Sequence, residues 1–191
     1  DRIAEAALLA ASAMRDNPLH AAALGDDPAR RVRVMRAVFE RHLASPRRSV
    51  HGVWAGGSLI GLAGSTSPGD CRPSLRELAG LVPALGIAGR RTRRLIEWQR
   101  AWSRVEPDAP HAHLGPVAVA EEHRRRGVGS MLLAHHTAHL DATGQRGYLE
   151  TDKPENVRFY EAHGFVVTHR TTVIGVQNWF MSRTPRSPLA G

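Results

Sequence analysis

Apolar positions recur with a helical period in two stretches at the start of the chain. The first covers residues 2–14, is rich in alanine and leucine, and ends before Asp16-Asn17-Pro18. The second covers residues 27–43, with Asp27 as its N-cap and Pro28 at the first helical position. We therefore expect two helices ahead of the first strand.

The pattern then changes to short apolar runs. Residues 49–54 and 59–65 are separated by Gly56-Gly57, which is typical of a β-hairpin. A helical pattern returns over residues 73–106 and is broken near residues 83–89. The remaining elements are predicted as strand 114–120, helix 127–142, strand 147–151, helix 155–163, and strands 165–174 and 176–182 that meet at Gly175.

This order predicts a single α/β domain over residues 1–191, with helices packed on a mixed, mostly antiparallel sheet. Residues 73–106 form a helical insert within it, and residues 183–191 a loose tail. No apolar run approaches the roughly 20 residues of a membrane span, so we expect no membrane partner. Cys71 is the only cysteine, which excludes an internal disulfide and favours a cytoplasmic protein. No basic cluster lies near Cys71 in the sequence, so we expect an inert thiol.

The formal net charge of +8 raises the question of nucleic-acid binding. Lys153 is the sole lysine, and the arginines are scattered in pairs along the chain. This distribution favours a solvated basic surface, so we expect no nucleic-acid partner. Arginine also binds phosphate groups bidentately, which leaves a smaller phosphorylated ligand open.

A glycine-containing loop links strand 114–120 to the helix that follows it. Its sequence is Arg124-Arg125-Arg126-Gly127-Val128-Gly129-Ser130. Such a junction offers free backbone N–H groups and the positive end of the helix dipole to an anion. Gly127 and Gly129 would let the backbone approach a pyrophosphate closely. The P-loop and the dinucleotide fingerprint do not fit, because Met131 and Leu132 stand where those motifs need other residues.

Two blocks of the chain resemble the GCN5-related N-acetyltransferase superfamily. The first comprises residues 114–119 with Arg124-x-x-Gly127-x-Gly129. The second comprises Leu149-Glu150-Thr151, Asn156 and Phe159-Tyr160-Glu161-x-x-Gly164-Phe165, and it is especially similar to puromycin N-acetyltransferase and its relatives. The resemblance covers residues 114–180 well, whereas residues 1–110 match only in the order of elements.

The resemblance implies a sheet split between two central strands and acetyl-CoA as co-substrate. The pantetheine arm would pair with the backbone of the first motif strand, at Val117, Ala118 and Val119. Gly115-Pro116 suggests a bulge or strand edge there. Asn156 would hold the pantetheine or phosphate region, or act as the N-cap of its helix. The phosphates would contact Arg124, Arg125, Arg126, Gly127, Val128, Gly129 and Ser130.

Acetyl transfer to a primary amine by direct attack needs an oxyanion donor, an acid and a base. By analogy with the family, the Val117 N–H is the oxyanion donor. Tyr160 is the general acid near the sulfur, unless it only packs. The base stays open: His113 shares a strand face with Val117 by period-two counting, and its rivals are Glu150 and His111 with a chain of waters.

Three histidines on one helix, His135, His136 and His139, lack a carboxylate or cysteine at ligand spacing, so we expect no metal. The acceptor is predicted to be a small molecule, because the helical insert resembles a lid. A non-catalytic CoA-binding module and a protein or peptide N-acetyltransferase are the alternatives. A homodimer is left open.

Overall fold

A six-stranded mixed sheet organises the part of the chain that the computed structural model describes, residues 2–71 and 74–186. The strand order is β1-β2-β3-β4-β6-β5, and every neighbouring pair is antiparallel except β3 and β4. This confirms the predicted sheet. The strands are β1 (Arg48–Ala55), β2 (Ser58–Thr66), β3 (Ala112–Val119), β4 (Gly147–Thr151), β5 (Val166–Val173) and β6 (Val176–Arg183).

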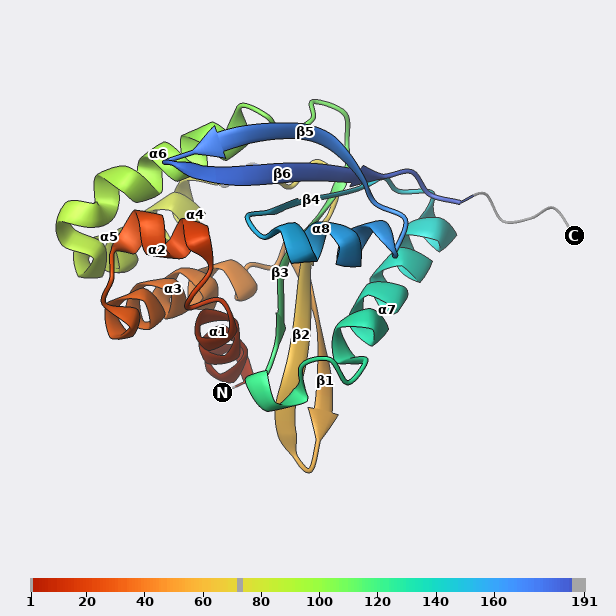
Figure 1. Ribbon diagram of the computed structural model, residues 1–191, viewed down its shortest axis with the longest axis horizontal. Helices are drawn as coiled ribbons and strands as arrows, with labels where there is room; N and C mark the ends of the chain where they lie inside the picture. The colour runs from red at the N-terminus through yellow and green to blue at the C-terminus, as the bar shows by residue number, and fades with distance from the viewer. Residues whose placement is uncertain (1, 72–73, 187–191) are drawn as a thin grey trace, which may run out of the picture.

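The sheet splits between its two parallel strands. β3 and β4 pair only at Ala112↔Gly147 and His113↔Tyr148, and then diverge (Figure 1). On the other side of β3, Leu114 pairs with Ser65 and Val117 with Ala63. Gly115 and Pro116 therefore stand opposite the single residue Gly64, which is the predicted bulge. The split and the bulge position the candidate site.

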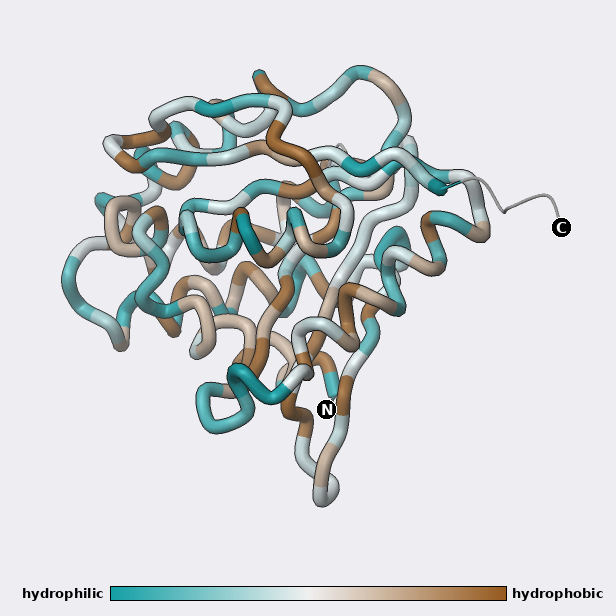
Figure 2. The backbone as a smooth tube through the Cα atoms, turned by 45° about the vertical axis from the view of Figure 1, so that its right-hand side comes forward, coloured by the Kyte–Doolittle hydropathy of each residue, from teal (hydrophilic) through white to brown (hydrophobic). Residues whose placement is uncertain are grey.

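Helices cover both faces of the sheet. α1 (Arg2–Ala13) and α3 (Pro28–Leu43) pack with Leu62 and Ala118 in one apolar cluster. α7 (Val128–Thr143) and α8 (Pro154–Glu161) contribute to a second cluster that contains Leu114, Leu149 and Phe165. Hydrophobic segments gather where helices meet strands, and the outer loops are largely hydrophilic (Figure 2).

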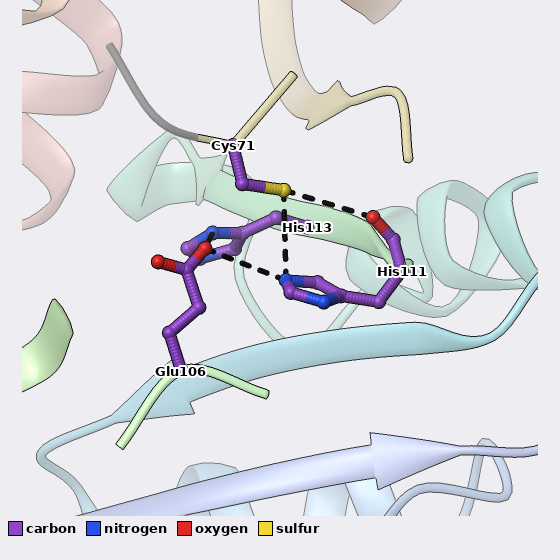
Figure 3. A group of neighbouring side chains, drawn as sticks. All are labelled: Cys71, Glu106, His111 and His113. Carbon is purple, nitrogen blue, oxygen red and sulfur yellow. Dashed lines mark hydrogen bonds and ion pairs between the residues drawn. The ribbon is translucent and has the colours of Figure 1, made fainter. Parts of the chain in front are cut away.

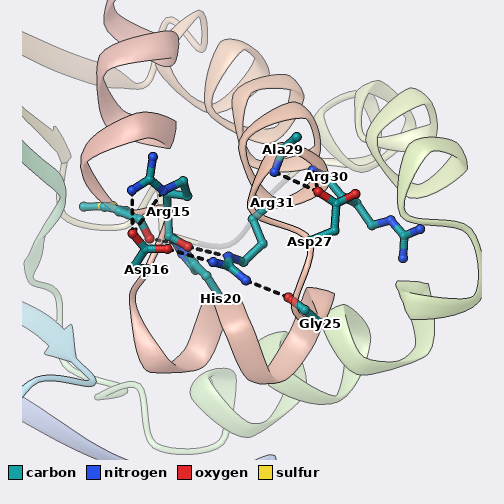
Figure 4. A network of polar contacts seen from close by, with 9 residues as sticks. Arg15, Asp16, His20, Gly25, Asp27, Ala29, Arg30 and Arg31 are labelled. Atoms are coloured by element: carbon teal, nitrogen blue, oxygen red, sulfur yellow. Dashed lines mark hydrogen bonds and ion pairs between the residues drawn. The ribbon is translucent and has the colours of Figure 1, made fainter.

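An additional helix, α2 (Pro18–Leu24), lies between the two predicted at the start of the chain. Buried Arg31 of α3 ties this corner together (Figure 4). Its guanidinium donates to the carbonyls of Arg15 and Gly25 at 2.7 and 2.8 Å and to the Asp16 carboxylate at 2.7 Å. Hydrogen bonds from Arg15 and Arg31 lower the pKa of Asp16 to about 2.

The insert folds as α4 (Leu75–Gly80), α5 (Val82–Ala88), a 3-10 turn (Gly89–Arg91) and α6 (Thr92–Ser103). Its expected first residue, Pro73, lies outside the described residues. Trp102 of α6 donates from Nε1 to Asn178 Oδ1 of β6 at 3.0 Å, so the insert is fastened to the far half of the sheet. No helix in the described ranges is long and apolar enough to cross a membrane.

The predicted loose tail, residues 183–191, begins too early. Arg183 ends β6, is buried, and donates twice to the Asp141 carboxylate of α7 at 2.7 Å. The backbone N–H of Arg186 reaches the same carboxylate at 2.7 Å. The bond with Arg183 lowers the pKa of Asp141 to about 2. The rest of the predicted tail, residues 187–191, lies outside the described residues.

Candidate active site

The N-terminus of α7 presents the unpaired amides that the glycine loop predicts. Gly127 is the N-cap, with a φ of 85°, and its carbonyl accepts from the Met131 N–H at 2.9 Å. The amides of Val128, Gly129 and Ser130 have no hydrogen-bond partner among the described residues. These three N–H groups and the helix dipole make a cradle for an anion.

The two glycines of the loop have different roles. A Cβ built on Gly127 meets no atom within 4 Å, so the space beside this backbone is open. A Cβ on Gly129 would lie 3.3 Å from Cζ of Phe159 in α8. Gly129 is therefore explained by close packing of α7 against α8, in addition to the expected approach of a ligand.

The three arginines of the loop differ in their contacts. Arg124 donates from Nη2 to the carbonyl of Ala13 at 2.8 Å, which ties the loop to the end of α1. Arg125 and Arg126 are exposed, and Arg125 has a φ of 59°. Arg125 and Arg126 thus stay exposed in the loop that precedes these amides, while Arg124 is engaged with the protein.

The backbone of β3 turns an unpaired edge toward β4. The Ala120 N–H donates to the Ile60 carbonyl of β2 at 2.9 Å. Since peptide groups alternate along a strand, those of Val117 and Val119 point the other way, where pairing with β4 has ended. An extended chain could add to this edge by main-chain hydrogen bonds. The peptide group of Ala118, between them, faces β2.

Tyr160 and Asn156 lie on α8, on the same side of the sheet as α7. Tyr160 is only 9% exposed and packs between Phe159 and Phe165 at ring distances of 5.4 and 6.1 Å. Burial raises its pKa, so the phenol keeps its proton. Asn156 donates from Nδ2 to Thr151 Oγ1 at 3.2 Å. The alternative that Asn156 is the N-cap is wrong, because Lys153 holds that position.

His113 does not share a face with Val117. Leu114 and Val117 both contact the cluster under α7, on either side of the bulge at Gly115 and Pro116. The extra residue of the bulge reverses the alternation, so period-two counting across it fails. His113 therefore projects to the opposite face of β3, the one covered by α3.

On that face His113 meets Glu150 of β4. His113 Nε2 lies 2.7 Å from Glu150 Oε2, and the Glu150 side chain is only 4% exposed. Burial disfavours a charged ring, but the Glu150 carboxylate and Cys71 outweigh it and raise the pKa of His113 to about 10. The Tyr148 ring packs edge-on against His113 at 5.3 Å. Of the candidate bases, the structure thus brings His113 and Glu150 into one pair.

Cys71, Glu106 and His111 complete this cluster (Figure 3). His111 Nε2 lies 3.5 Å from Cys71 Sγ and 3.5 Å from Glu106 Oε1. Burial opposes ionisation of the thiol, but His111 and His113 outweigh it and lower the pKa of Cys71. The expectation that Cys71 has no basic neighbours is therefore wrong, which removes the reason for predicting an inert thiol. No motif in the sequence marks Glu106, although it precedes His111 by only five residues. Cys71, the other partner of His111, is brought there from 40 positions away by tertiary packing.

Candidate site residues therefore lie on both faces of the sheet where β3 and β4 diverge. The amide cradle and Tyr160 lie on the face covered by α7 and α8. The pair of His113 and Glu150 lies on the other face, beside His42 of α3, whose Nε2 contacts the Gly115 carbonyl at 3.3 Å. Such an arrangement can hold a donor and an acceptor on opposite sides of one strand gap.

Comparison with known proteins agrees with this geometry. Residues 19–165 match the model of the acetyltransferase (GNAT) family. A Corynebacterium glutamicum structure described as "histone acetyltransferase HPA2 and related acetyltransferase" superposes with a TM-score of 0.71 at 21% identity, over 97% of this chain and 92% of that one. A GNAT-family acetyltransferase structure from Desulfovibrio desulfuricans gives a TM-score of 0.54 at 15% identity, over 93% and 91%. The chain belongs to the acetyltransferase (GNAT) family.

Proposed function

We propose that this chain moves an acetyl group from acetyl-CoA to a primary amine of a small molecule by direct attack. The observation that carries the proposal is the set of unpartnered amides of Val128, Gly129 and Ser130 beside the unpaired edge of β3. A diphosphate matches the first feature and an extended amide-containing arm matches the second. Bound acetyl-CoA would supply a thioester whose acetyl carbon is open to attack by an amine.

The groups around the cradle fit such a ligand. Gly127 leaves open space at the backbone, and Arg125 and Arg126 are exposed beside it. The Val117 N–H, directed into the strand gap, would stabilise the oxyanion. Tyr160, kept protonated by burial, would donate its phenolic proton to the departing sulfur. Asn156, through its bond to Thr151, would fix the end of β4 against this ligand.

On the opposite face, His113 and Glu150 would receive the proton from the amine. Because the pKa of His113 is raised to about 10, the ring must first release its own extra proton, so turnover is expected to rise with pH. Glu150 holds His113 Nε2 at 2.7 Å, so the ring offers Nδ1 to the acceptor side. The orienting carboxylate also stabilises the ring once it has gained a proton. Glu106, at the end of the insert, lies 3.9 Å from that Nδ1. The insert thus borders the place where the amine would enter, which supports a small acceptor.

A thiol-release assay with acetyl-CoA tests the proposal. The panel should contain aminonucleosides, aminoglycosides, polyamines and peptides with free N-termini, each compared with acetyl-CoA alone. Turnover of a small amine is the expected result. Turnover of peptides alone would instead favour a protein or peptide acetyltransferase. CoA binding without turnover of any amine would favour a non-catalytic CoA-binding module, and either outcome overturns the proposal.

A further inference from the structure

Four side chains with metal-ligand chemistry converge where β3 and β4 diverge (Figure 3). They are a thiol, a carboxylate and two imidazoles, and one ligand atom from each lies within 4.8 Å of all the others. Cys71 comes from the β2–α4 connection, Glu106 and His111 from the segment between α6 and β3, and His113 from β3. One short segment thus supplies Glu106, His111 and His113, and packing of the fold adds Cys71.

The separations suit a tetrahedral cation. His111 Nε2 is 3.5 Å from Cys71 Sγ and 3.5 Å from Glu106 Oε1, and His113 Nδ1 is 3.9 Å from Glu106 Oε1. With metal–ligand bonds of roughly 2.0–2.3 Å, the donor atoms of a tetrahedral zinc site lie about 3.3–3.7 Å apart. Small side-chain rotations would bring the set onto a common centre.

Each histidine has an outer partner of the kind that metal-binding histidines use. His111 Nδ1 lies 2.9 Å from the Ala109 carbonyl, which can only accept a hydrogen bond. His113 Nε2 lies 2.7 Å from the Glu150 carboxylate. In the neutral rings these bonds place the protons on His111 Nδ1 and His113 Nε2. The opposite nitrogens keep their lone pairs, and both face Glu106.

The site is enclosed but still reachable by an ion. His111 is 5% exposed, and the side chains of His113 and Glu106 are 25% and 20% exposed. We propose that Cys71, Glu106, His111 and His113 bind a borderline-soft divalent cation, for which Zn²⁺ is the best match. A thiolate ligand disfavours Mg²⁺ and Ca²⁺. Binding forms one metal–sulfur, two metal–nitrogen and one metal–oxygen bond in place of the ion's bonds to water, and releases that water, the thiol proton and any ring protons to solvent.

This site departs from the expectation of no metal, which considered only the histidines of α7. His135, His136 and His139 belong to no group of metal ligands among the described residues, whereas His111 and His113 do. Glu106, His111 and His113 are close in sequence but match no known ligand motif, and the fold brings Cys71 to them from 40 positions away.

Cobalt spectroscopy of the full chain, stripped with a chelator, tests the site without any measurement of catalysis. Cys71 is the only cysteine, so a thiolate-to-Co²⁺ charge-transfer band can arise from no other residue. We expect this band, together with strong visible bands of tetrahedral Co²⁺, to saturate at one equivalent and to disappear when Zn²⁺ is added. A weak octahedral spectrum without the charge-transfer band would overturn the proposal.

Matched variants locate the ion. Cys71→Ser should abolish the charge-transfer band. Glu150→Gln, which removes an outer carboxylate, should weaken Co²⁺ binding by about 10–100-fold. His139→Gln, on the exposed face of α7, should bind as the wild type does. If both Cys71→Ser and His111→Gln bind Co²⁺ with wild-type affinity, the site is refuted. Circular dichroism checks that the variants are folded. Failure of the wild type to bind CoA would refute the proposed acetyl transfer, and it would leave the cobalt result unaffected.

Discussion

Nε2 of His113 lies 2.7 Å from Oε2 of Glu150, and this contact joins β3 to β4 just beyond their last backbone pair, His113↔Tyr148. Backbone pairing between the two strands thus ends here, and a side-chain hydrogen bond connects them at the place where an extended ligand could enter. The pair lies on the face opposite α7, away from the amide cradle. The proposed proton acceptor and the proposed phosphate cradle therefore lie on opposite faces of the sheet and meet at its gap.

Replacing Glu150 with Gln should lower kcat by about 10²–10⁴-fold, with little change in KM for acetyl-CoA. The amide removes the charge that orients His113 and stabilises its protonated ring. Steady-state kinetics with the amine found in the thiol-release assay gives the measurement. The control is Glu155→Gln, an exposed carboxylate at the start of α8. Equal kcat values for the two variants would exclude Glu150 from proton transfer.

Replacing Tyr160 with Phe separates the acid role from packing. The phenyl ring keeps the contacts with Phe159 and Phe165, whereas the proton donor is lost. We expect kcat to fall by about 10²-fold or more, with unchanged calorimetric affinity for CoA and an unchanged urea midpoint. If kcat stays at the wild-type value, Tyr160 has a packing role only.

The sequence predicts the scaffold well because most of its signals are local. Helical and alternating periods, the Gly56-Gly57 turn and the Gly127 helix start all act within a few residues, and the structure confirms them. The face of β3 on which His113 lies could not be predicted from alternation, because the bulge at Gly115 and Pro116 reverses it. The relation to puromycin N-acetyltransferase stays a prediction.

Contacts between segments far apart in the sequence could not be predicted from local patterns. The thiol of Cys71 reaches His111 across 40 sequence positions, and no local pattern indicates that contact. Glu106 is only five positions from His111, but no motif marks its carboxylate. Helix α2 was missed for a different reason: it has only 7 residues, and its Asn17 provides no side-chain cap. Short helices of this kind depend on tertiary packing, which here comes from Asp152 accepting from the Leu19 N–H at 2.7 Å.

Buried His136 of α7 should make stability depend on pH. Burial, together with nearby histidines and Arg183, lowers its pKa to about 4 from the usual histidine value of 6.5. Between these values the unfolded chain binds more protons than the folded one. Stability is therefore expected to fall as the pH drops from 6.5 toward 4, by up to about 3 kcal/mol from this group.

Urea unfolding at several pH values checks this expectation. His136→Phe should flatten the loss between pH 6.5 and 4, whereas exposed His139→Gln should leave it unchanged. Asp141, whose pKa is about 2, acts in a separate window, from pH 3.8 down to 2. An identical slope in the His136 variant and the wild type would show that this ring does not titrate on unfolding.

Zn²⁺ should inhibit acetyl transfer, because the proposed metal site uses His113 Nδ1, the same atom that would accept the amine proton. Equimolar Zn²⁺ is expected to lower turnover, and a chelator to restore it. In Cys71→Ser the Zn²⁺ concentration for half-inhibition should rise by about tenfold or more, relative to the turnover of that variant without metal. Inhibition with the same Zn²⁺ dependence in both proteins would place the inhibitory ion elsewhere.

The central claim is that main-chain amides at the start of α7 hold the diphosphate of CoA, and calorimetry on two variants of Gly127 tests it most directly. Its φ of 85° is tolerated by Asn and Asp better than by other side chains, and a Cβ there meets no atom within 4 Å. Asn and Asp have nearly the same size and differ in charge. Gly127→Asp should bind CoA at least about tenfold more weakly than Gly127→Asn, because its carboxylate would face the phosphates. Equal CoA affinities for the two variants would contradict the account.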